Sequence, residues 1–393
     1  MTPIAFTFTR DRFTWLAYFM LAYYAYLQAA LGPLMPFLAA ELELSYTLRG
    51  LHFSAFALGM IIAGATADRA ARYFGRRTLF WGGGAGMVLG VIILTLGQTS
   101  PITIFGSFVM GTIGSYLLVM IQATLADHHG AMRAVALTES NVGASAAAML
   151  APLLISQLEN FGFSWRFALL AMVAAWAIAL AATSRVPIPQ SSAENRGVNQ
   201  PKARLPALFW VYWLVVLLGV SVEWSTGFWA ADFLENVVGI RRVDAAASMA
   251  VFYVAILLGR WFGSRLSRIV LPNRLLLIAS AILLTGFPIF WLSRSPISAL
   301  PGLFLMGLGI ANLFPMTLSI VSNLAPDMAN AASARTSLAA GIAILVMPQI
   351  LGSTADRIGI QSAFAIVGGL ALGVLVIVWL ANRAFAFMQA ASV

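Results

Sequence analysis

Long runs of apolar residues follow one another along the chain, with only short polar breaks between them. A helix that crosses a membrane needs about 20 mostly apolar residues, and each run meets that length. The sequence therefore predicts an all-α membrane protein with twelve transmembrane helices, at residues 13–39, 47–67, 78–98, 101–126, 134–158, 164–184, 207–234, 244–266, 273–293, 296–321, 331–355 and 362–384.

One polar break is much longer than the others. Residues 185–206 (RVPIPQSSAENRGVNQPKARLP) are rich in proline, serine, asparagine and charge, a composition typical of a flexible connection. We expect a cytoplasmic linker at residues 185–206 between an N-terminal six-helix bundle at 1–184 and a C-terminal six-helix bundle at 207–393.

Composition supports the membrane class. The chain of 393 residues is 61% hydrophobic and only 9% charged, whereas a soluble domain is about 25% charged. If the N-terminus lies inside, 16 of the 23 Lys and Arg residues fall on the inner side and six on the outer side. Positive residues favour the cytoplasmic side, so we expect an inner-membrane protein with both termini in the cytoplasm.

Several chemical classes are excluded by residue content. The chain has no cysteine and three histidines, so disulfides and thiolate metal sites are ruled out and no metal site is expected. No cofactor and no nucleic acid partner are expected. The net charge of +9 is attributed to the Lys and Arg residues of short loops, which set the orientation in the membrane. The apolar run behind the N-terminus is too long for the core of a cleavable signal peptide.

The two halves of the chain repeat. Residues 106–111 (GSFVMG) match residues 302–307 (GLFLMG) at an offset of 196, and Pro152 matches Pro348 at the same offset. Nearer the start, the pattern of Gly64, Asp68 and Arg69 matches that of Gly263, Ser267 and Arg268 at an offset of 199. Matches in the same order predict two pseudo-symmetric bundles built from parallel repeats.

Residues 64–77 (GATADRAARYFGRR) resemble the signature between the second and third spans of the major facilitator superfamily, with a gap from Asp68 to Gly75 that is longer than usual by about one helical turn. Residues 352–357 (GSTADR) look like a second relic of that signature. Residues 143–156 are weakly similar to a motif of proton antiporters, and residues 307–315 to fucose-permease-like transporters. The resemblance implies a monomeric secondary transporter that works by alternating access in the lipid bilayer.

The same resemblance implies where a cytoplasmic gate lies, because the family sets the second span beside the eleventh and the eighth beside the fifth. We expect Asp68 to pair with Arg335, and Glu139 to pair with Arg265 or Arg268, with the signs exchanged between the repeats. The alternative is that each charge reaches the headgroups or pairs within its own bundle. The candidate gating residues are Asp68, Arg69, Arg72, Glu139, Arg265, Arg268 and Arg335.

Two charges lie deeper in the predicted spans. Glu223 is near the middle of the seventh span, with no basic residue on nearby turns of that helix. Burial of an unpaired carboxylate favours its protonated form, as a proton carrier requires, although a protonated Glu that bonds a neighbouring helix is the alternative. Arg260 lies about two turns inside the eighth span and is a candidate anion-binding residue. It is also a candidate partner for Glu223 or Glu139, or a snorkelling side chain.

In this family the first, fourth, seventh and tenth spans line the central cavity, so pseudo-symmetry selects residues that face it. Amides and aromatic faces suit a polar, mostly uncharged ligand such as a sugar, whereas membrane Tyr, Trp, Gln and Asn also serve at interfaces and between helices. The candidate substrate-binding residues are Tyr24, Gln28, Tyr116, Glu223, Trp224, Phe228 and Asn312.

The sequence thus predicts a secondary active transporter that moves a small polar solute, with a sugar-like solute as the leading candidate, by symport or antiport with protons. Proton-driven efflux of amphiphiles and transport of a carboxylate held by Arg260 are the alternatives. An enzyme is not expected, because no cluster of nucleophile, base or metal ligands lies at membrane depth. A receptor is not expected either, because a soluble signalling domain is missing.

Overall fold

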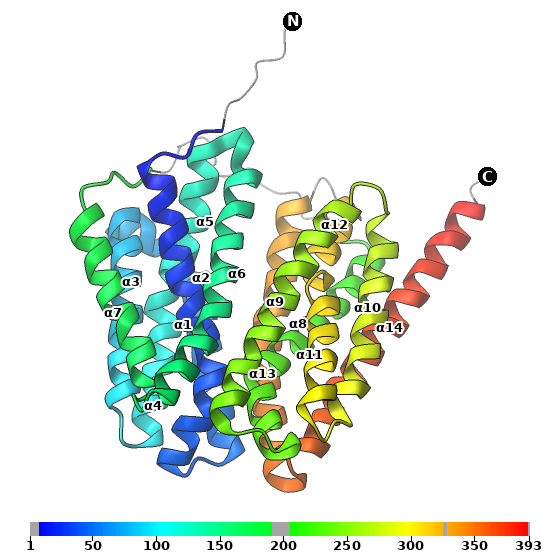
Figure 1. Ribbon diagram of the computed structural model, residues 1–393. Coiled ribbons are helices and arrows are strands. Elements are labelled where there is room, and N and C mark those ends of the chain that lie inside the picture. Colours follow the sequence, from blue (N-terminus) through cyan, green and yellow to red (C-terminus); the bar gives the residue numbers. More distant parts are fainter. Residues whose placement is uncertain (1–7, 191–204, 325–327, 392–393) are drawn as a thin grey trace, which may run out of the picture. The chain divides into compact units, whose positions relative to one another are not determined.

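The structure is a computed structural model that describes residues 8–190, 205–324 and 328–391. These residues form helices joined by short turns, with no strand among them (Figure 1). The helices are α1 (Arg12–Leu42), α2 (Tyr46–Phe74), α3 (Arg76–Leu96), α4 (Ser100–Val109), η1 (Met110–Gly114), α5 (Ser115–His129), η2 (Gly130–Met132), α6 (Arg133–Asn160), α7 (Arg166–Thr183), α8 (Ala207–Phe233), η4 (Leu234–Val238), α9 (Arg242–Leu266), α10 (Pro272–Trp291), α11 (Pro296–Ile310), α12 (Leu313–Leu324), α13 (Ala329–Ile358) and α14 (Ile360–Ala391).

The helices coincide with the predicted apolar runs to within a few residues at most ends. The helix α2 is longer than its predicted apolar run at 47–67, because it continues past Asp68 and Arg69 to Phe74. Gly75 follows as the residue that caps α3. The extra residues between Asp68 and Gly75 therefore lengthen the helix α2.

Ten helices of the described residues are long and apolar enough to cross a membrane. One of them, Ser100–Asn160, has 61 residues, about three times the length of a single crossing. It reverses at η2, and α5 packs against α6. The helix α1, with 31 residues, is not among the ten. The prediction of twelve crossings therefore depends on counting α1 and both arms of this hairpin.

By internal contacts the chain forms two compact units. Unit 1 comprises Met1–Leu34 and Ala55–Val198, and unit 2 comprises Met35–Ser54 and Asn199–Val393. Residues 35–54, the end of α1 and the start of α2, thus belong with the C-terminal half by their contacts. The predicted bundles 1–184 and 207–393 stay a prediction, and most of the predicted linker, at 191–204, lies outside the described residues.

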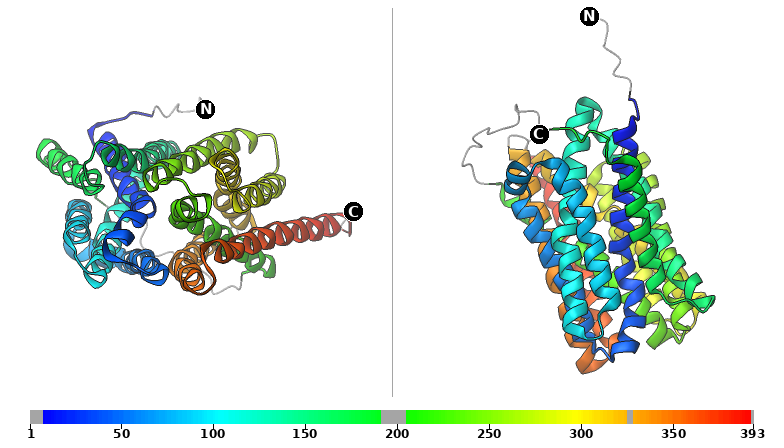
Figure 2. Two further views of the ribbon diagram at one scale, coloured as in Figure 1. Left: turned by 60° about the horizontal axis from the view of Figure 1, so that its bottom comes forward. Right: turned by 90° about the vertical axis from the view of Figure 1, so that its left-hand side faces the viewer.

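Unit 1 is organised around α3, which packs against α4, α5 and α7 (Figure 2). The glycines of α3 provide the close approach, because small residues let helix backbones come together where lipid supplies no hydrophobic drive for association. A Cβ added at Gly83 would lie 2.4 Å from the backbone nitrogen of Leu117 on α5. Tyr23 of α1 donates a hydrogen bond to the Gly84 carbonyl at 3.2 Å.

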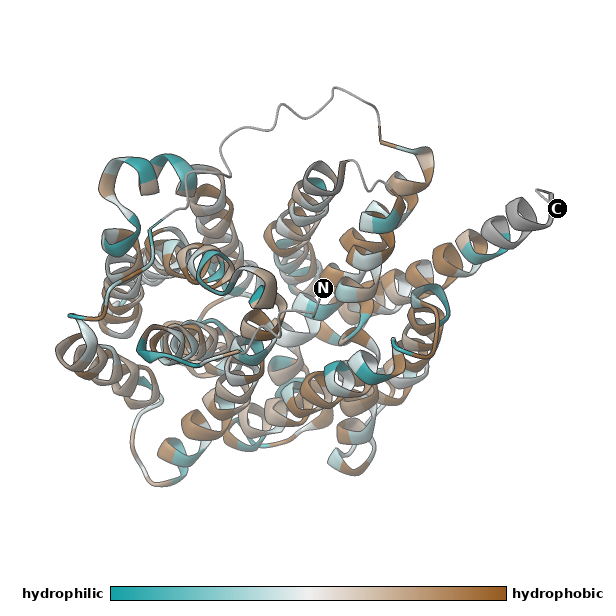
Figure 3. Cartoon of the chain, turned by 90° about the horizontal axis from the view of Figure 1, so that it is seen from above, coloured by the Kyte–Doolittle hydropathy of each residue, from teal (hydrophilic) through white to brown (hydrophobic). Residues whose placement is uncertain are grey.

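Unit 2 is organised around α8, which packs against α9, α12, α13 and α14. Its aromatic side chains fill the centre: Phe233 packs against Phe290 of α10 at 4.7 Å and against Phe364 of α14 at 5.0 Å between ring centroids. The helix walls are coloured mainly as hydrophobic and many polar residues lie at helix ends (Figure 3).

Substitution of Gly83 by alanine tests the packing of α3. We expect Gly83→Ala to lower the free energy of unfolding by about 1–3 kcal/mol, because its methyl group would collide with the α5 backbone. Gly82→Ala is the matched control, since nothing lies within 4 Å of its added methyl group. The midpoint of thermal unfolding in detergent measures both, and equal midpoints for the two variants would contradict the packing argument.

Candidate functional site

The predicted acid in the seventh span has a partner on the neighbouring helix. The guanidinium of Arg260 on α9 lies 3.7 Å from Glu223 on α8, with 44% and 24% of the two side chains exposed. Glu223 is therefore not unpaired, and of the alternatives that the sequence left open for Arg260, the structure shows the pair with Glu223. The Tyr253 phenol, seven residues before Arg260 and on the same face of α9, lies near enough to Glu223 to interact with it electrostatically.

Asn312 lies at the break between α11 and α12 and bridges to α9. Its amide donates a hydrogen bond to the Gly259 carbonyl at 2.8 Å, one residue before Arg260. Gly263 faces the same amide, and a Cβ there would come within 2.0 Å of Asn312 Oδ1. Asn312 therefore holds the part of α9 that carries Arg260, a role between helices that the sequence left open.

Trp224 and Phe228 lie one turn apart on α8, with ring centroids 5.1 Å apart. Trp224 is partly exposed beside Glu223, whereas Phe228 is buried. Of these two candidates, only Trp224 keeps exposed surface.

The candidates in unit 1 divide in the same way. The Tyr24 hydroxyl is fully buried and shares a hydrogen bond of 2.9 Å with Ser115. Tyr116 is partly exposed, and its hydroxyl lies 2.7 Å from that of Thr66 on α2. The amide of Gln28 has a long contact of 3.6 Å with the Met60 sulfur. Gln28 and Tyr116 keep accessible surface, and Tyr24 packs the interior.

Glu139 has a partner that sequence reasoning did not find. Arg10 donates to both oxygens of its carboxylate, at 2.5 and 2.8 Å, and the Tyr18 hydroxyl donates at 3.1 Å. All three residues belong to unit 1, as in the alternative of pairing within one bundle. Pairing of Glu139 with Arg265 or Arg268 stays a prediction for another state of the protein.

The other gating candidates are exposed. Arg265 lies over the ring of Trp261 at 3.6 Å, and Arg335 lies 5.7 Å from the ring centre of Trp210. Such contacts of a cation with an aromatic face are favourable even without an ion pair. The remaining exposed candidates are Asp68, Arg69, Arg72 and Arg268.

A polar cluster at the start of α1 was also missed. Asp11 accepts hydrogen bonds from the backbone and hydroxyl of Thr14 at 2.8 and 2.6 Å, and lies 2.8 Å from His128. Partial burial alone would raise the pKa of Asp11, but these hydrogen bonds and the neighbouring His128 hold that pKa below its usual value. The pair His128-His129 was the one signal in the sequence.

The sequence analysis also missed Asp232, the acidic side chain with the least exposed surface among the described residues. Asp232 of α8 has no exposed side-chain surface and forms an ion pair with Arg49 of α2. In the sequence, Arg49 counted only as a loop charge and Asp232 stood near the end of a predicted span. Within the described residues, no group of three or more metal-binding side chains comes together.

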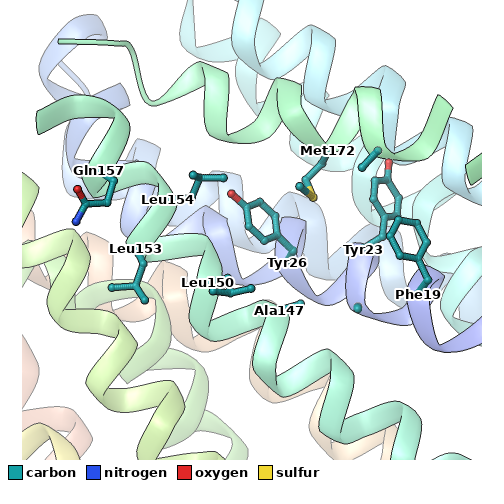
Figure 4. Close-up of a pocket in the computed structure, with 11 residues that line it drawn as sticks. Phe19, Tyr23, Tyr26, Ala147, Leu150, Leu153, Leu154, Gln157 and Met172 are labelled. Carbon is teal, nitrogen blue, oxygen red and sulfur yellow. The ribbon is translucent and has the colours of Figure 1, made fainter. Parts of the chain in front are cut away.

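A crevice of about 450 Å³ lies in unit 1 between α1, α6 and α7 (Figure 4). The hydroxyls of Tyr23 and Tyr26 in its wall already donate to the carbonyls of Gly84 and Ala168. The wall is otherwise apolar apart from Gln157 and contains none of the candidate substrate residues. The crevice therefore lacks the free polar groups that a polar solute needs.

The contact between Gly263 and Asn312 predicts a coupled pair of substitutions. We expect Gly263→Ala to lower the midpoint of thermal unfolding, because its methyl group displaces the Asn312 amide, and Asn312→Ala to remove that penalty. The double variant should thus lose less than the sum of the single losses. Gly64→Ala, at the equivalent position of the first repeat, is the control, since nothing lies within 4 Å of it. Additive losses would contradict the predicted clash.

Known proteins match this chain over most of its length. The sequence profile of the Major Facilitator Superfamily matches residues 14–348. An uncharacterized MFS-type transporter of Yersinia pestis is 26% identical over 364 residues, which are 88% of this chain and 90% of that protein.

Solved structures show the same fold at low sequence identity. A mutant form of the nucleoside transporter NupG superposes with a TM-score of 0.78 at 13% identity, covering 93% of this chain and 98% of that chain. A bacterial homolog of the human lysosomal transporter Spinster, inward-facing and occupied, gives 0.73 at 16%, covering 96% and 98%. The D-xylose-proton symporter gives 0.72 at 16%, covering 93% and 96%. With its family profile matched over residues 14–348, the chain belongs to the Major Facilitator Superfamily of membrane transporters.

Proposed function

We propose that this transporter moves a small polar solute together with protons, and that Glu223 and Arg260 form the centre of its solute and proton site. The observation that carries the proposal is the loose ion pair of these side chains, 3.7 Å apart and both partly exposed, on adjacent membrane helices. Charges in membrane helices are costly and usually functional.

The geometry of the pair suits reversible protonation. At 3.7 Å the two groups attract each other without a hydrogen bond between them. A proton on Glu223 removes that attraction and leaves Arg260 in need of another acceptor, which a solute hydroxyl or carboxylate supplies. Proton binding and solute binding are thereby linked through one guanidinium.

The surrounding side chains favour a solute that carries hydroxyl groups. Trp224 offers a partly exposed aromatic face beside Glu223, and Tyr253 offers a phenol. Two of the structural relatives are named as a nucleoside transporter and a D-xylose-proton symporter, and both solutes are polar molecules with sugar hydroxyls. The likeness of fold is compatible with this solute class.

A carboxylate solute is the second candidate. Arg260 is 44% exposed and only loosely held by Glu223, so its guanidinium retains donors for a carboxylate. We also retain, as parts of the proposal, an inner-membrane location, cytoplasmic termini, a monomer, and a cytoplasmic latch between Asp68 and Arg335.

Proton coupling is tested with Glu223→Gln in proteoliposomes under an imposed pH gradient. A pH-sensitive dye inside the vesicles reports proton entry on addition of sugars, nucleosides or carboxylates. We expect the variant to lose gradient-driven accumulation while solute exchange at equal pH continues, because amide and acid have similar shape but only the acid releases a proton. Accumulation with the wild-type pH dependence would rule out the role of Glu223.

The control for that experiment is Glu235→Gln. Glu235 pairs with Arg242 at 2.9 Å, so this pair also joins the α8–η4 helix to α9, away from the proposed site. We expect the control to keep proton-driven accumulation. If Glu235→Gln lost proton-driven accumulation to the same extent as Glu223→Gln, loss of any acid on this helix would abolish coupling. The result would then not assign the proton site to Glu223.

Substitution of Arg260 separates the two solute classes. With a carboxylate solute, Arg260→Ala should raise KM by about tenfold or more, because a charged hydrogen bond contributes roughly 1.5–3 kcal/mol, whereas Arg260→Lys should retain part of the affinity. With an uncharged solute the increase should be smaller and similar for both variants. Initial rates of uptake over a range of solute concentrations measure the effect.

A further inference from the structure

The two ends of unit 2 differ in how their arginines are compensated. At the end where α9 begins, Arg241 pairs with Asp244 at 2.7 Å, and Arg242 pairs with Glu235 at 2.9 Å. At the opposite end, α9 ends, α10 begins and α14 ends, as Figure 1 shows. We call this opposite end the inner end, since it carries the end of α14 that leads to the predicted cytoplasmic terminus.

The inner end carries four exposed arginines. They are Arg265 and Arg268 near the end of α9, Arg274 in the first turn of α10, and Arg383 on α14. Within the residues that the structure describes, none of the four forms an ion pair with a carboxylate.

The sequence explains this lack of acidic partners. Between Asp244 and Asp356 the chain has one acidic residue, Asp327, and no acidic residue follows Asp356. Asp327 lies outside the described residues. The positive charges of the inner end are therefore left to groups that do not belong to the described part of this unit.

Two of these arginines lie on tryptophan rings. The Arg383 guanidinium is 3.9 Å from the ring centre of Trp379, one turn earlier on α14. The Arg265 guanidinium is 3.6 Å from the ring centre of Trp261. Stacking holds a guanidinium in place and leaves the donors at its edge for an anion. The two indoles are 42% and 47% exposed, and tryptophan favours the level of the lipid headgroups.

A polar contact joins the start of α10 to the last turns of α14. The Asn382 amide donates a hydrogen bond to the Asn273 carbonyl at 3.1 Å. Arg274 and Arg383 directly follow these two asparagines in the chain, so the two arginines are attached at the same corner of the unit. We call Asn273, Arg274, Trp379, Asn382 and Arg383 the α10–α14 corner.

Exposed apolar residues flank the corner. Leu271, just before α10, is 67% exposed, and Leu380, next to Trp379, is 53% exposed. An anionic phospholipid satisfies both kinds of surface, because its phosphate binds guanidinium groups and its acyl chains cover the leucines. A free phosphate ion satisfies only the arginines. The chemistry of the corner therefore favours a lipid over a small anion.

We propose that the α10–α14 corner binds the phosphate of an anionic phospholipid, which the guanidiniums of Arg274 and Arg383 hold. The Trp379 ring positions Arg383 by stacking. Arg265 and Arg268 on the neighbouring turn add to the attraction of the inner end for a negatively charged leaflet. The bound lipid bridges α10 and α14 and stabilises their contact. It shares no residue with the proposed solute and proton site, so failure of either proposal leaves the other intact.

Thermal unfolding of the purified protein in a neutral detergent tests the recognition of charge. Phosphatidylglycerol, which is anionic, is added to the micelles in increasing mole fraction, and phosphatidylcholine, which has no net charge, is added in a parallel series. We expect phosphatidylglycerol to raise the midpoint of unfolding and phosphatidylcholine to raise it much less. Equal rises with the two lipids would overturn the proposal.

Substitution of the two arginines locates the effect. The double variant Arg274→Gln with Arg383→Gln should need about tenfold or more phosphatidylglycerol for the half-maximal rise, because each arginine near an anionic lipid surface adds to the attraction.

The matched control is the double variant Arg294→Gln with Arg357→Gln. Arg294 lies three residues after the end of α10 and Arg357 lies three residues before the start of α14. The control therefore removes the same charge at the opposite ends of the same two helices, and it should keep the wild-type response to lipid. An equal loss in both double variants would overturn the assignment to the corner.

Inorganic phosphate distinguishes a lipid site from a site for a small anion. We expect phosphate without added lipid to leave the midpoint of unfolding unchanged relative to chloride at equal ionic strength. A rise as large as that with phosphatidylglycerol, and lost in the Arg274 and Arg383 double variant, would overturn the lipid as the ligand.

The unaltered protein provides a second measurement that does not depend on folding of the variants. Phosphatidylglycerol with a photoactivatable diazirine in its acyl chain is irradiated with the protein in vesicles, and cross-linked peptides are identified by mass spectrometry. We expect adducts on the peptides that contain Leu271 and Leu380, and we expect excess phosphatidylglycerol, but not phosphatidylcholine, to remove them. Adducts on other helices with none on these two peptides would overturn the proposal, as would equal competition by both lipids.

Discussion

The cost of a charge among apolar helices constrains the rest of this structure. Lipid offers no water to an ionised side chain, so each charge within a span needs an opposite charge, a hydrogen bond or access to solvent. Glu223 pairs with Arg260, and Asp232 pairs with Arg49. Each pair joins different helices, so the few charges that the membrane tolerates also specify which helices lie together.

Close packing is the second requirement, and it depends on small residues. Glycines on α3, α9 and η1 come so near to neighbouring backbones or side chains that most have no room for a methyl group. The repeat explains only part of this pattern. Gly64 faces open space, whereas its counterpart Gly263 touches Asn312, so equivalent positions in the two halves have acquired different neighbours.

Pseudo-symmetric polar residues nevertheless keep one common role. Tyr116 of α5 shares a hydrogen bond with Thr66 of α2, and Asn312, at the start of α12, donates to Gly259 of α9. The helices α2 and α9 carry the matching Gly64 and Gly263 patterns, so both residues connect equivalent helices within their own half. The repeat thus identified Tyr116 and Asn312 as residues at comparable positions, although each forms a hydrogen bond to a neighbouring helix.

The sequence alone determined the class of protein, the helices and the family, because hydropathy and the signature at residues 64–77 are local properties of the chain. It also located Glu223, Arg260 and Glu139 as charges that need an explanation. Only the tertiary structure decided their partners: Arg260 for Glu223, Arg10 for Glu139, and Arg49 for Asp232. Helix periodicity shows which residues share a face, but it does not show which face of another helix lies opposite or at what height. Pairing between helices depends on that register, and long-range packing alone sets it.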